Sequence, residues 1–436
     1  MRDINTNKAF TVGICTLGCR VNQYESRAIA ERLEEKGFVI KAFSEVCDAY
    51  IINTCAVTAE SERKSRQMAR RANKKNPDAV ILVTGCQAQL HPEEAEALPG
   101  VRYVGGNASK LEVADAVEQL LSERETVLKK TAVITDTYEQ YAVSKPDHTR
   151  AYIKIEDGCK NQCAYCVIPK VRGPVRSKPF DSVLEEVRAV AAIGYREIVL
   201  TGIEVTDYQY GLPELINAVS EIDGIERVRL ASVNPAFITA DFIDGIKHNP
   251  KFCHHFHLSI QSCCDKTLRA MRRPYNTRIL KRNIAYTKAA LPDIAFTADI
   301  ICGFPGETEE DFTETLKNTE ELGLIHAHIF PYSPRPETEA AEMPNQVPEN
   351  VKNLRCERLS KICQVSRHSI INAFREEKKT FYVLFEESRG GYSYGHTENF
   401  IEVAVKSEKP LDGNIYRVEL LSPMKNAEVW EAVICE

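Results

Sequence analysis

Three cysteines stand close together at residues 158–166, directly after a strand-like run at residues 151–155. They are Cys159, Cys163 and Cys166, with the spacing Cys-x3-Cys-x2-Cys. Three thiolates on one loop can bind three irons of a [4Fe–4S] cube and leave the fourth iron open to a small molecule. The alternatives are buried structural thiols and a zinc site, although structural zinc usually takes four ligands in paired Cys-x2-Cys units. The spacing therefore favours an iron–sulfur site.

Strand-like runs alternate with helical segments from residue 151 onward. They cover residues 151–155, 197–201, 227–231, 255–260, 295–301 and 326–332. This alternation is typical of a parallel α/β fold. Six units are too few for an eight-stranded barrel, so we expect a partial (βα)6 barrel. The active-site groups of such barrels lie at the carboxyl ends of the strands, which is where the three cysteines stand.

Polar or glycine-rich residues follow other strands of the predicted barrel. Glycine allows close backbone approach to a ligand, and hydroxyl, amide and carboxylate groups can orient it. We therefore predict a cofactor-binding rim that contains Thr201, Gly202, Glu204, Ser259, Gln261, Asp299 and Gly303. His254, His255 and His257 resemble a metal cluster, but strand alternation sends His254 to the opposite face. We expect no metal site from these three histidines.

The N-terminal third also alternates strands with helices, which predicts a second parallel α/β sheet. The expected strands are residues 10–17, 49–54 and 79–84, with a helix at residues 25–36. Cys19, Cys55 and Cys86 each follow one of these strands. Because ligands bind at the carboxyl edge of such sheets, we expect the three thiols to converge and hold a second cluster. The alternative is three small apolar cysteines in a core.

Composition limits the class of protein. The chain has 436 residues, 15 cysteines and a formal net charge of −6. This length accommodates two or three domains, and no run of about 18 apolar residues predicts a membrane span. Residues 1–5 contain no apolar signal region, so the many cysteines indicate a reducing cytoplasm and metal-binding or catalytic thiols. We expect neither a membrane nor DNA as a partner.

Four segments follow from these patterns. We expect an N-terminal α/β cluster domain at residues 1–135, a linker at 136–148, a barrel core at 149–376 and a C-terminal domain at 377–436. Period-two runs at residues 380–386, 391–397, 400–405, 415–421 and 427–433 predict a small antiparallel β-barrel. Barrels of this size often bind RNA, and the alternative is a structural lid.

Basic and aromatic side chains give candidates for RNA contacts. Arg63, Arg66 and Arg70 share one face of a predicted helix, which fits either phosphate contacts or a solvated surface. A second basic region and the C-terminal barrel add the remaining candidates, which are Arg272, Arg273, Tyr394 and His396.

Three features together resemble the radical S-adenosylmethionine (SAM) methylthiotransferases. They are residues 16–26 (Thr-Leu-Gly-Cys-Arg-Val-Asn-Gln-Tyr-Glu-Ser), the Cys55 and Cys86 strand ends, and the Cys159–Cys166 spacing. The first motif is similar to the branch that acts on N6-threonylcarbamoyladenosine beside the tRNA anticodon. The chain departs from the family pattern at three positions. Glu204 stands where relatives usually carry Asn or Gln, Pro174 replaces a basic residue, and Glu337 replaces Gly.

The resemblance implies a tRNA-modifying enzyme with a C-terminal TRAM domain, two [4Fe–4S] clusters and SAM. It implies that a radical generated from SAM removes hydrogen from C2 of the adenine at tRNA position 37, and that the N-terminal cluster delivers the methylthio group. The implied partners are the tRNA anticodon stem-loop and an electron donor such as flavodoxin or ferredoxin. The alternatives are isopentenyl-adenosine 37, a ribosomal-protein aspartate, or a non-enzymatic iron–sulfur carrier.

Overall fold

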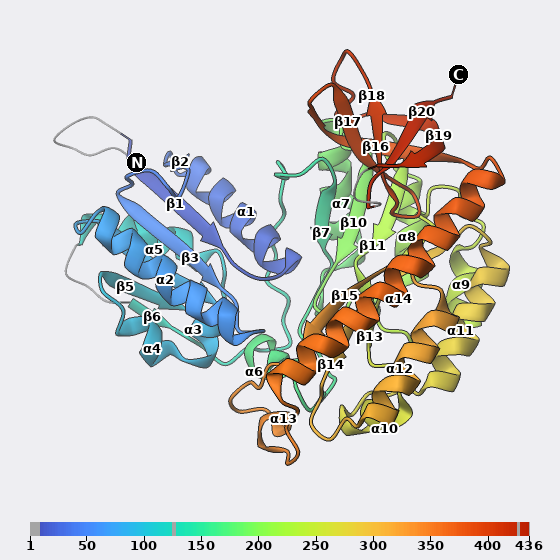
Figure 1. Cartoon of the computed structure of the whole chain (residues 1–436). Coiled ribbons are helices and arrows are strands. Elements are labelled where there is room, and N and C mark those ends of the chain that lie inside the picture. Colours follow the sequence, from blue (N-terminus) through green and yellow to red (C-terminus); the bar gives the residue numbers. More distant parts are fainter. Residues whose placement is uncertain (1–8, 124–127, 425–427, 436) are drawn as a thin grey trace.

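The computed structural model describes residues 9–123, 128–424 and 428–435, so the expectation that residues 1–5 lack a signal region lies outside it. Figure 1 shows an N-terminal α/β unit, a larger central α/β unit and a C-terminal β-barrel. In the described part of the chain, no helix is both long and apolar enough to cross a membrane.

A six-stranded parallel sheet forms the N-terminal unit. Its spatial order is β2 (Val39–Lys41), β1 (Thr11–Thr16), β3 (Ala49–Thr54), β4 (Val80–Gly85), β5 (Val101–Gly105) and β6 (Leu128–Lys130). The three predicted strands are the central ones. The sequence analysis did not identify β2, β5 and β6, of which β2 and β6 are only three residues long.

Helices cover both faces of this sheet. They are α1 (Arg20–Glu35), α2 (Ala59–Lys75), α3 (Cys86–Leu90), α4 (Pro92–Glu96) and α5 (Glu112–Ser122). Strand alternation sends Ile51 and Leu82 into one core with α1 and α5, and Ile52 and Ile81 into the other core with α2. The helix predicted at residues 25–36 begins earlier, at Arg20, because Cys19 already occupies the N-cap position.

The segment at residues 131–150 contains no helix or strand, yet it is packed. Tyr141 lies against Tyr24 of α1 with ring centroids 5.8 Å apart. The backbone N–H of Val143 donates to Glu186 at 2.8 Å, and the Tyr138 hydroxyl donates to the Lys154 carbonyl at 2.8 Å. The segment predicted as a linker therefore packs between the N-terminal and central units.

Parallel strands form the central unit in two sheets that follow each other around the core. The first contains β11 (Arg227–Leu230), β10 (Glu197–Thr201) and β7 (Ala151–Lys154), and the second contains β12 (Ser232–Val233), β13 (His255–Gln261), β14 (Ala295–Cys302) and β15 (His326–Pro331). The strands β11 and β12 are separated by a single residue, so one chain segment contributes to both sheets. The six predicted strands are all present.

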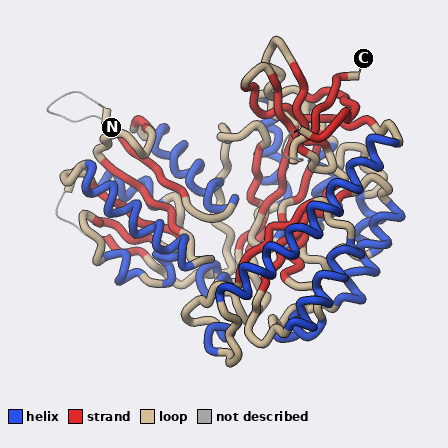
Figure 2. The backbone as a smooth tube through the Cα atoms, viewed as in Figure 1, coloured by secondary structure: helices blue, strands red, loops and turns tan. Residues whose placement is uncertain are grey.

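An outer layer of helices covers these strands on one side (Figure 2). The helices are α7 (Phe180–Ala192), α8 (Leu212–Ser220), α9 (Ala240–Ile246), α10 (Asp265–Ala270), α11 (Thr277–Ala290), α12 (Glu309–Leu322) and α14 (Glu349–Glu376). Shorter elements between them are α6 (Ile168–Arg172), the 3-10 helix η1 (Val205–Asp207) and α13 (Glu339–Glu342). A continuous apolar core joins strands and helices, from Ile153 on β7 to Leu359 on α14.

The C-terminal unit is a closed five-stranded barrel with the order β16 (Thr380–Arg389), β17 (Tyr392–Thr397), β18 (Glu402–Lys406), β20 (Trp430–Ile434) and β19 (Ile415–Pro423). The expectation that all its strands are antiparallel is wrong for one pair, since β18 and β20 pair in parallel. Trp430 is fully buried in the barrel core, which also contacts Ile371 and Phe374 of α14.

Buried ions attach this barrel to the central sheet. Glu197 on β10 accepts hydrogen bonds from Arg227 and Arg229 on β11, and Arg150 lies 3.4 Å away. Arg227 also donates to the Tyr382 carbonyl at 2.8 Å. The three arginines hold the pKa of Glu197 far below its usual value although burial opposes the shift. Glu197 is therefore a charged centre of the contact between the two units.

Candidate functional site

The loop that carries Cys159, Cys163 and Cys166 is closed at its base by two short antiparallel strands, β8 (Glu156–Asp157) and β9 (Arg176–Ser177). Gly158 has φ +91, and a Cβ there would lie 2.0 Å from the carbonyl oxygen of Pro174. The loop therefore requires glycine at this position. The sequence analysis missed this ladder because each of its strands has only two residues.

Each thiol of this loop receives a hydrogen bond. The Asn161 amide donates to Cys159 Sγ at 3.5 Å, and the Ile168 backbone N–H donates to Cys166 Sγ at 3.4 Å. Arg273 donates to Cys163 Sγ at 3.3 Å. Burial raises the pKa of Cys159 to about 11 and that of Cys166 to about 12. A metal that binds these thiols must therefore displace their protons.

The second group of cysteines follows three neighbouring strands of the N-terminal sheet. Cys19 caps α1 after β1, Cys55 follows β3, and Cys86 begins α3 directly after β4. A Cβ on Gly18 would lie 2.8 Å from Cys55 Sγ, so the first two strand ends meet closely. Burial raises the pKa of Cys55 to about 11, and the nearby Cys86 and Cys19 add to the shift. The structure thus brings together three cysteines that are distant in sequence.

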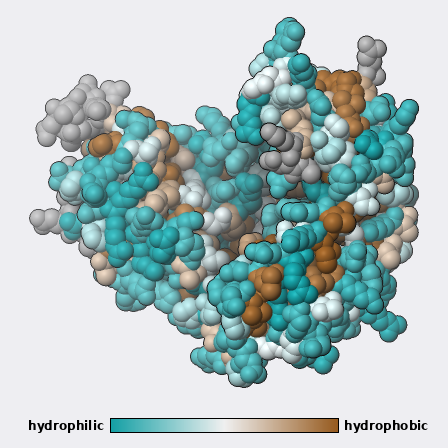
Figure 3. Space-filling model, in the orientation of Figure 1, coloured by the Kyte–Doolittle hydropathy of each residue, from teal (hydrophilic) through white to brown (hydrophobic). Residues whose placement is uncertain are grey.

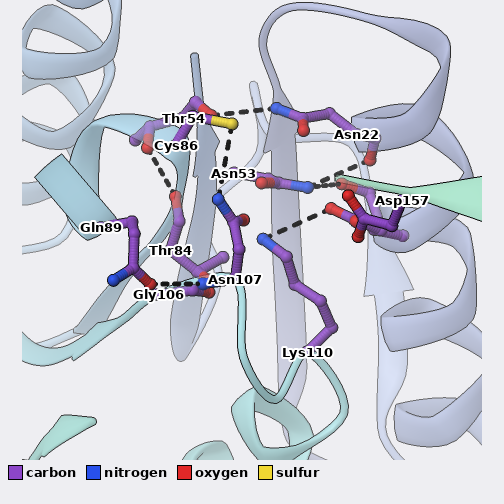
Figure 4. A network of polar contacts seen from close by, with 12 residues as sticks. Asn22, Asn53, Thr54, Thr84, Cys86, Gln89, Gly106, Asn107, Lys110 and Asp157 are labelled. Atoms are coloured by element: carbon purple, nitrogen blue, oxygen red, sulfur yellow. Dashed lines mark hydrogen bonds and ion pairs between the residues drawn. The ribbon is translucent and has the colours of Figure 1, made fainter. Parts of the chain in front are cut away.

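Two cysteines of this second group, Cys55 and Cys86, receive hydrogen bonds, and Figure 4 shows the contact of Asn107 with Cys86. The Val57 backbone N–H donates to Cys55 Sγ at 3.4 Å. The Asn107 amide lies 3.5 Å from Cys86 Sγ and also donates to the Val171 carbonyl at 2.7 Å, which joins the N-terminal unit to α6. Arg172, the last residue of α6, donates from Nε to Cys86 Sγ at 3.3 Å. A residue of the central unit therefore contacts a cysteine of the N-terminal unit.

Arg172 is the centre of a fully buried ionic network between the two units. Its guanidinium contacts Glu25 on α1 and lies 3.3 Å from Asp157. Lys110 and Lys154 lie 3.3 and 2.9 Å from Glu25. Burial alone would raise the pKa of Glu25, but Arg172 and the two lysines hold it well below its usual value. The network places an excess of positive groups beside Cys86.

Three buried carboxyl groups lie near the Cys159 loop. A Cβ on Gly202 would lie 2.5 Å from Glu156 Oε2, and the backbone N–H of Glu204 donates to the same oxygen at 2.8 Å. Lys160 pairs with Asp207 Oδ1 at 2.7 Å. Within the described part of the chain, Glu156 Oε1 and Asp207 Oδ2 are buried without a hydrogen-bond partner. Burial raises the pKa of Glu156 and Glu204. The two carboxyl oxygens without partners suit a cationic ligand.

Other predicted rim residues differ in their placement. Gln261 ends β13 with φ 68, a conformation that side-chain-bearing residues adopt rarely and that often marks functional sites. The Ser259 carbonyl accepts from Arg273 at 2.8 Å. Gly303 follows β14 and has φ +75, and a Cβ there would lie 2.4 Å from Lys352 Cγ. Thr201 is buried at the end of β10.

Asp299 lies in the interior of β14, three residues before its end. Its carboxylate is 3.2 Å from His257 Nε2. The prediction grouped it with the strand-end residues because the run to Gly303 was treated as one segment.

Several predicted RNA contacts are engaged within the protein. Arg273 donates to Cys163 and Ser259, so it belongs to the thiol loop. His396 is half-buried, contacts Glu386 at 2.7 Å and stacks on Phe400 with centroids 4.7 Å apart. Tyr394 is half-buried beneath Arg389, with 4.6 Å from the guanidinium carbon to the ring centroid. Tyr394 and His396 are therefore only partly exposed, and RNA contact by them stays a prediction.

The remaining basic candidates are accessible. Arg63 and Arg70 are exposed on α2, and Arg66 is partly exposed. Arg63 pairs with Glu60 at 2.7 Å, whereas Arg66 is 3.7 Å from Glu94. Arg272 is exposed and pairs with Glu339 at 2.6 Å. The surface over α2 is largely hydrophilic in the space-filling view (Figure 3). RNA contact by these four arginines stays a prediction.

Two departures from the resembled pattern have structural counterparts. Glu337, which stands where Gly is usual, has φ 68, a conformation that glycine adopts without strain. The Glu337 carbonyl accepts from Lys170 at 2.7 Å. The carbonyl of Pro174 accepts from Arg176 at 3.1 Å.

Arg172, Asn107 and Glu156 were missed as site residues because nothing in the linear sequence indicates that their polar groups are buried beside the thiols.

Comparisons with known proteins cover nearly the whole chain. Residues 153–318 match the Radical SAM superfamily, and residues 11–106 match a group described as "Uncharacterized protein family UPF0004". The threonylcarbamoyladenosine tRNA methylthiotransferase MtaB of Bacillus subtilis (strain 168) is 37% identical over 425 residues, which cover 94% of this chain and 94% of the relative.

Two further similarities cover a smaller part of the chain. The tRNA-2-methylthio-N(6)-dimethylallyladenosine synthase of Carboxydothermus hydrogenoformans is 36% identical and covers 79% of this chain and 81% of the relative. The solved structure of TsrM, a radical SAM methyltransferase from Kitasatospora setae, has a TM-score of 0.59 at 14% identity. It covers 76% of this chain and 74% of that one, and it indicates the fold alone.

Proposed function

The chain belongs to the radical-SAM methylthiotransferase family, and from this premise we propose that it converts N6-threonylcarbamoyladenosine at tRNA position 37 into its 2-methylthio derivative. The observation that carries the proposal is the pair of thiol groups, one on the barrel loop and one at the edge of the N-terminal sheet, joined by Arg172. A single cluster suffices to start radical chemistry. A second is required where sulfur is delivered.

The family uses SAM and two [4Fe–4S] clusters. We assign one cluster to Cys159, Cys163 and Cys166 and the other to Cys19, Cys55 and Cys86. Both groups fit, because each offers three convergent thiols and N–H donors aimed at sulfur, which is a common environment of cluster ligands. When bound, these groups supply the radical and sulfur chemistry that an aryl C–H requires and acid–base side chains cannot provide.

The chain's own residues then bind and orient. We assign the carboxyl groups of Glu156, Glu204 and Asp207 to the positively charged amino and sulfonium groups of SAM, since Glu156 Oε1 and Asp207 Oδ2 are buried without a hydrogen-bond partner in the described part of the chain and such oxygens favour a cation. Arg273 anchors the thiol loop through Cys163 and Ser259. Arg172 and Asn107 orient Cys86 and connect the two units.

The tRNA substrate explains the remaining surfaces. An adenine at position 37 must leave its stack to reach both thiol groups, which is least costly in an unpaired anticodon loop. We assign backbone contacts to Arg63, Arg66, Arg70 and Arg272, and a TRAM-like RNA-binding role to the C-terminal barrel. A cytoplasmic location and an electron donor such as flavodoxin or ferredoxin belong to the same proposal.

The other substrates are less well supported. The alignment with the dimethylallyladenosine synthase covers 79% of this chain, whereas the alignment with the MtaB relative covers 94%. Methylthiolation of a ribosomal-protein aspartate has no relative among those compared above. A non-enzymatic carrier would require neither the strained rim residue Gln261 nor the buried carboxyl groups near the Cys159 loop.

Mass spectrometry of tRNA nucleosides tests the proposal. A strain that lacks this gene should lose 2-methylthio-N6-threonylcarbamoyladenosine and accumulate its unmethylthiolated precursor. A plasmid with the wild-type gene should restore the product, and one with Cys86→Ala should not. Persistence of the product in the deletion strain would exclude this substrate, and loss of the dimethylallyl product instead would favour the alternative branch.

A further inference from the structure

Three metal-ligating side chains, none of them a cysteine of the two thiol groups, meet on one face of the central sheet. They are His257 on β13, Asp299 on β14 and His328 on β15. Their ligand atoms all lie within 4.8 Å of one another. Asp299 stands directly opposite His328 in the parallel register, and His257 stands opposite Thr297. Three adjacent strands therefore fix the positions of the three side chains.

The orientation of His257 is set by its other ring nitrogen. Its Nδ1 is 2.8 Å from Thr297 Oγ1, and this contact leaves Nε2 directed at Asp299 Oδ2, 3.2 Å away. A hydrogen bond to the non-coordinating nitrogen is the usual arrangement for a histidine that binds metal. The same threonine hydroxyl contacts His255 at 3.0 Å, which keeps it in place.

We propose that His257, Asp299 and His328 bind one divalent first-row transition-metal ion. Two imidazoles and one carboxylate form a donor set typical of such ions, in contrast to the thiols that hold clusters. Two ligands that each lie about 2.1 Å from one ion are about 3 Å apart, which is close to the separation of His257 and Asp299. His328 is exposed on the edge strand, so a small rotation of its ring completes the set.

The site opens onto a groove. A cavity of about 660 Å³ lies between β15 and α14, and His328 is one of its lining residues together with His326, Phe330 and Glu357. This volume is in the range of small-molecule sites. An ion held by three protein ligands keeps open positions, and these can accept water or an oxygen donor from a ligand in the groove. The proposal uses neither the thiol groups nor the assigned tRNA substrate.

The simpler interpretation is a hydrogen-bonded His257–Asp299 pair with His328 as an unrelated neighbour. The two interpretations differ in metal binding. The holoenzyme with both clusters in their diamagnetic oxidised state is titrated with Mn²⁺, and the free ion is measured from its EPR signal. We expect one saturable Mn²⁺ site per chain, from which Zn²⁺ displaces Mn²⁺ because N/O ligands bind zinc more tightly.

Variants locate the site. Asp299→Asn and His328→Gln should each weaken Mn²⁺ binding by about tenfold or more, with cluster iron content and circular dichroism unchanged. His326→Gln is the matched control, because His326 lies on the same face of the same strand but outside the set. Absence of saturable binding, or equal binding by wild type and the Asp299/His328 double variant, would overturn the proposal. Failure of tRNA methylthiolation would leave these binding results unaffected.

Discussion

Arg172 Nε lies 3.3 Å from Cys86 Sγ, across the boundary between the central and N-terminal units. Arg172 lies six residues after Cys166 in the sequence. The chain segment that carries one thiol group therefore also places a cation beside the other thiol group. The guanidinium is fully buried and is neutralised by Glu25 and Asp157. The relative position of the two thiol groups therefore depends on this side chain.

Replacing Arg172 should disturb the relative position of the two thiol groups and so separate SAM cleavage from methylthio transfer. Arg172→Gln leaves Glu25 and Asp157 with fewer cations, and loss of one partner of a buried ion network costs about 3–5 kcal/mol. We expect methylthio transfer to fall about 10- to 100-fold, while cleavage of SAM to 5′-deoxyadenosine changes little. Arg172→Lys keeps the charge but loses the planar fork, so it should be intermediate. Equal loss of both activities would contradict this assignment.

The two thiol groups should differ in what their removal abolishes. After anaerobic reconstitution we expect about eight irons per chain, and about four after Ala replacement of either group. Loss of Cys19, Cys55 and Cys86 should retain SAM cleavage and abolish methylthio transfer. Loss of Cys159, Cys163 and Cys166 should abolish both. Iron content, 5′-deoxyadenosine and modified nucleoside are measured on the same samples, and Cys47→Ala serves as a buried control.

Glu197 should control the attachment of the C-terminal barrel. Glu197→Gln leaves Arg150, Arg227 and Arg229 without their common carboxylate, and we expect about 3–5 kcal/mol of destabilisation. The chain has a single tryptophan, and Trp430 lies in the barrel core, so its fluorescence during urea unfolding reports on this unit. Glu226→Gln, which disrupts an exposed pair with Arg196, should cost about 1 kcal/mol or less.

The same carboxylate predicts an acid dependence. The pKa of Glu197 is far lower in the folded protein than in the unfolded chain, where it is about 4.3. Its contribution is therefore fully present above about pH 4.3 and is lost as the pH falls below that value. Glu197→Gln should show a weaker loss of barrel stability between pH 5 and pH 3.5 than wild type. If the stability of the two proteins falls equally with pH, Glu197 does not stabilise the contact between the barrel and the central sheet.

The six strands of the central unit, three strands of the N-terminal sheet and the placement of both cysteine groups at strand ends could be predicted because they depend on local patterns, whereas β2, β5, β6, β8 and β9 could not. Apolar runs marked the six central strands, and Cys19, Cys55 and Cys86 stand at strand ends that a parallel sheet must align. The contacts of Arg172 with Cys86 and of Asp299 with His257 could not be predicted, because the partners are 86 and 42 residues distant in the sequence. The partial burial of His396 could not be predicted, because strand alternation cannot show that the barrel contacts the central unit at Arg227. The β18–β20 pairing results from barrel closure, which no local pattern records.

The basic face of α2 remains the most direct test of RNA contact. Glu62 on the same helix pairs with the buried Arg335 of the central unit, which fixes how α2 presents Arg63, Arg66 and Arg70. Neutralising these three to Gln should flatten the log–log salt dependence of anticodon stem-loop binding by roughly 2, at about 0.7 per phosphate contact on a single strand. Arg63 is partly neutralised by Glu60, so its share is the smallest. A triple control at Arg32, Arg188 and Arg196 changes net charge equally and should leave the slope intact. If both triple variants reduce the salt dependence equally, the effect comes from net charge alone. The basic face of α2 is then a solvated surface that does not contact RNA.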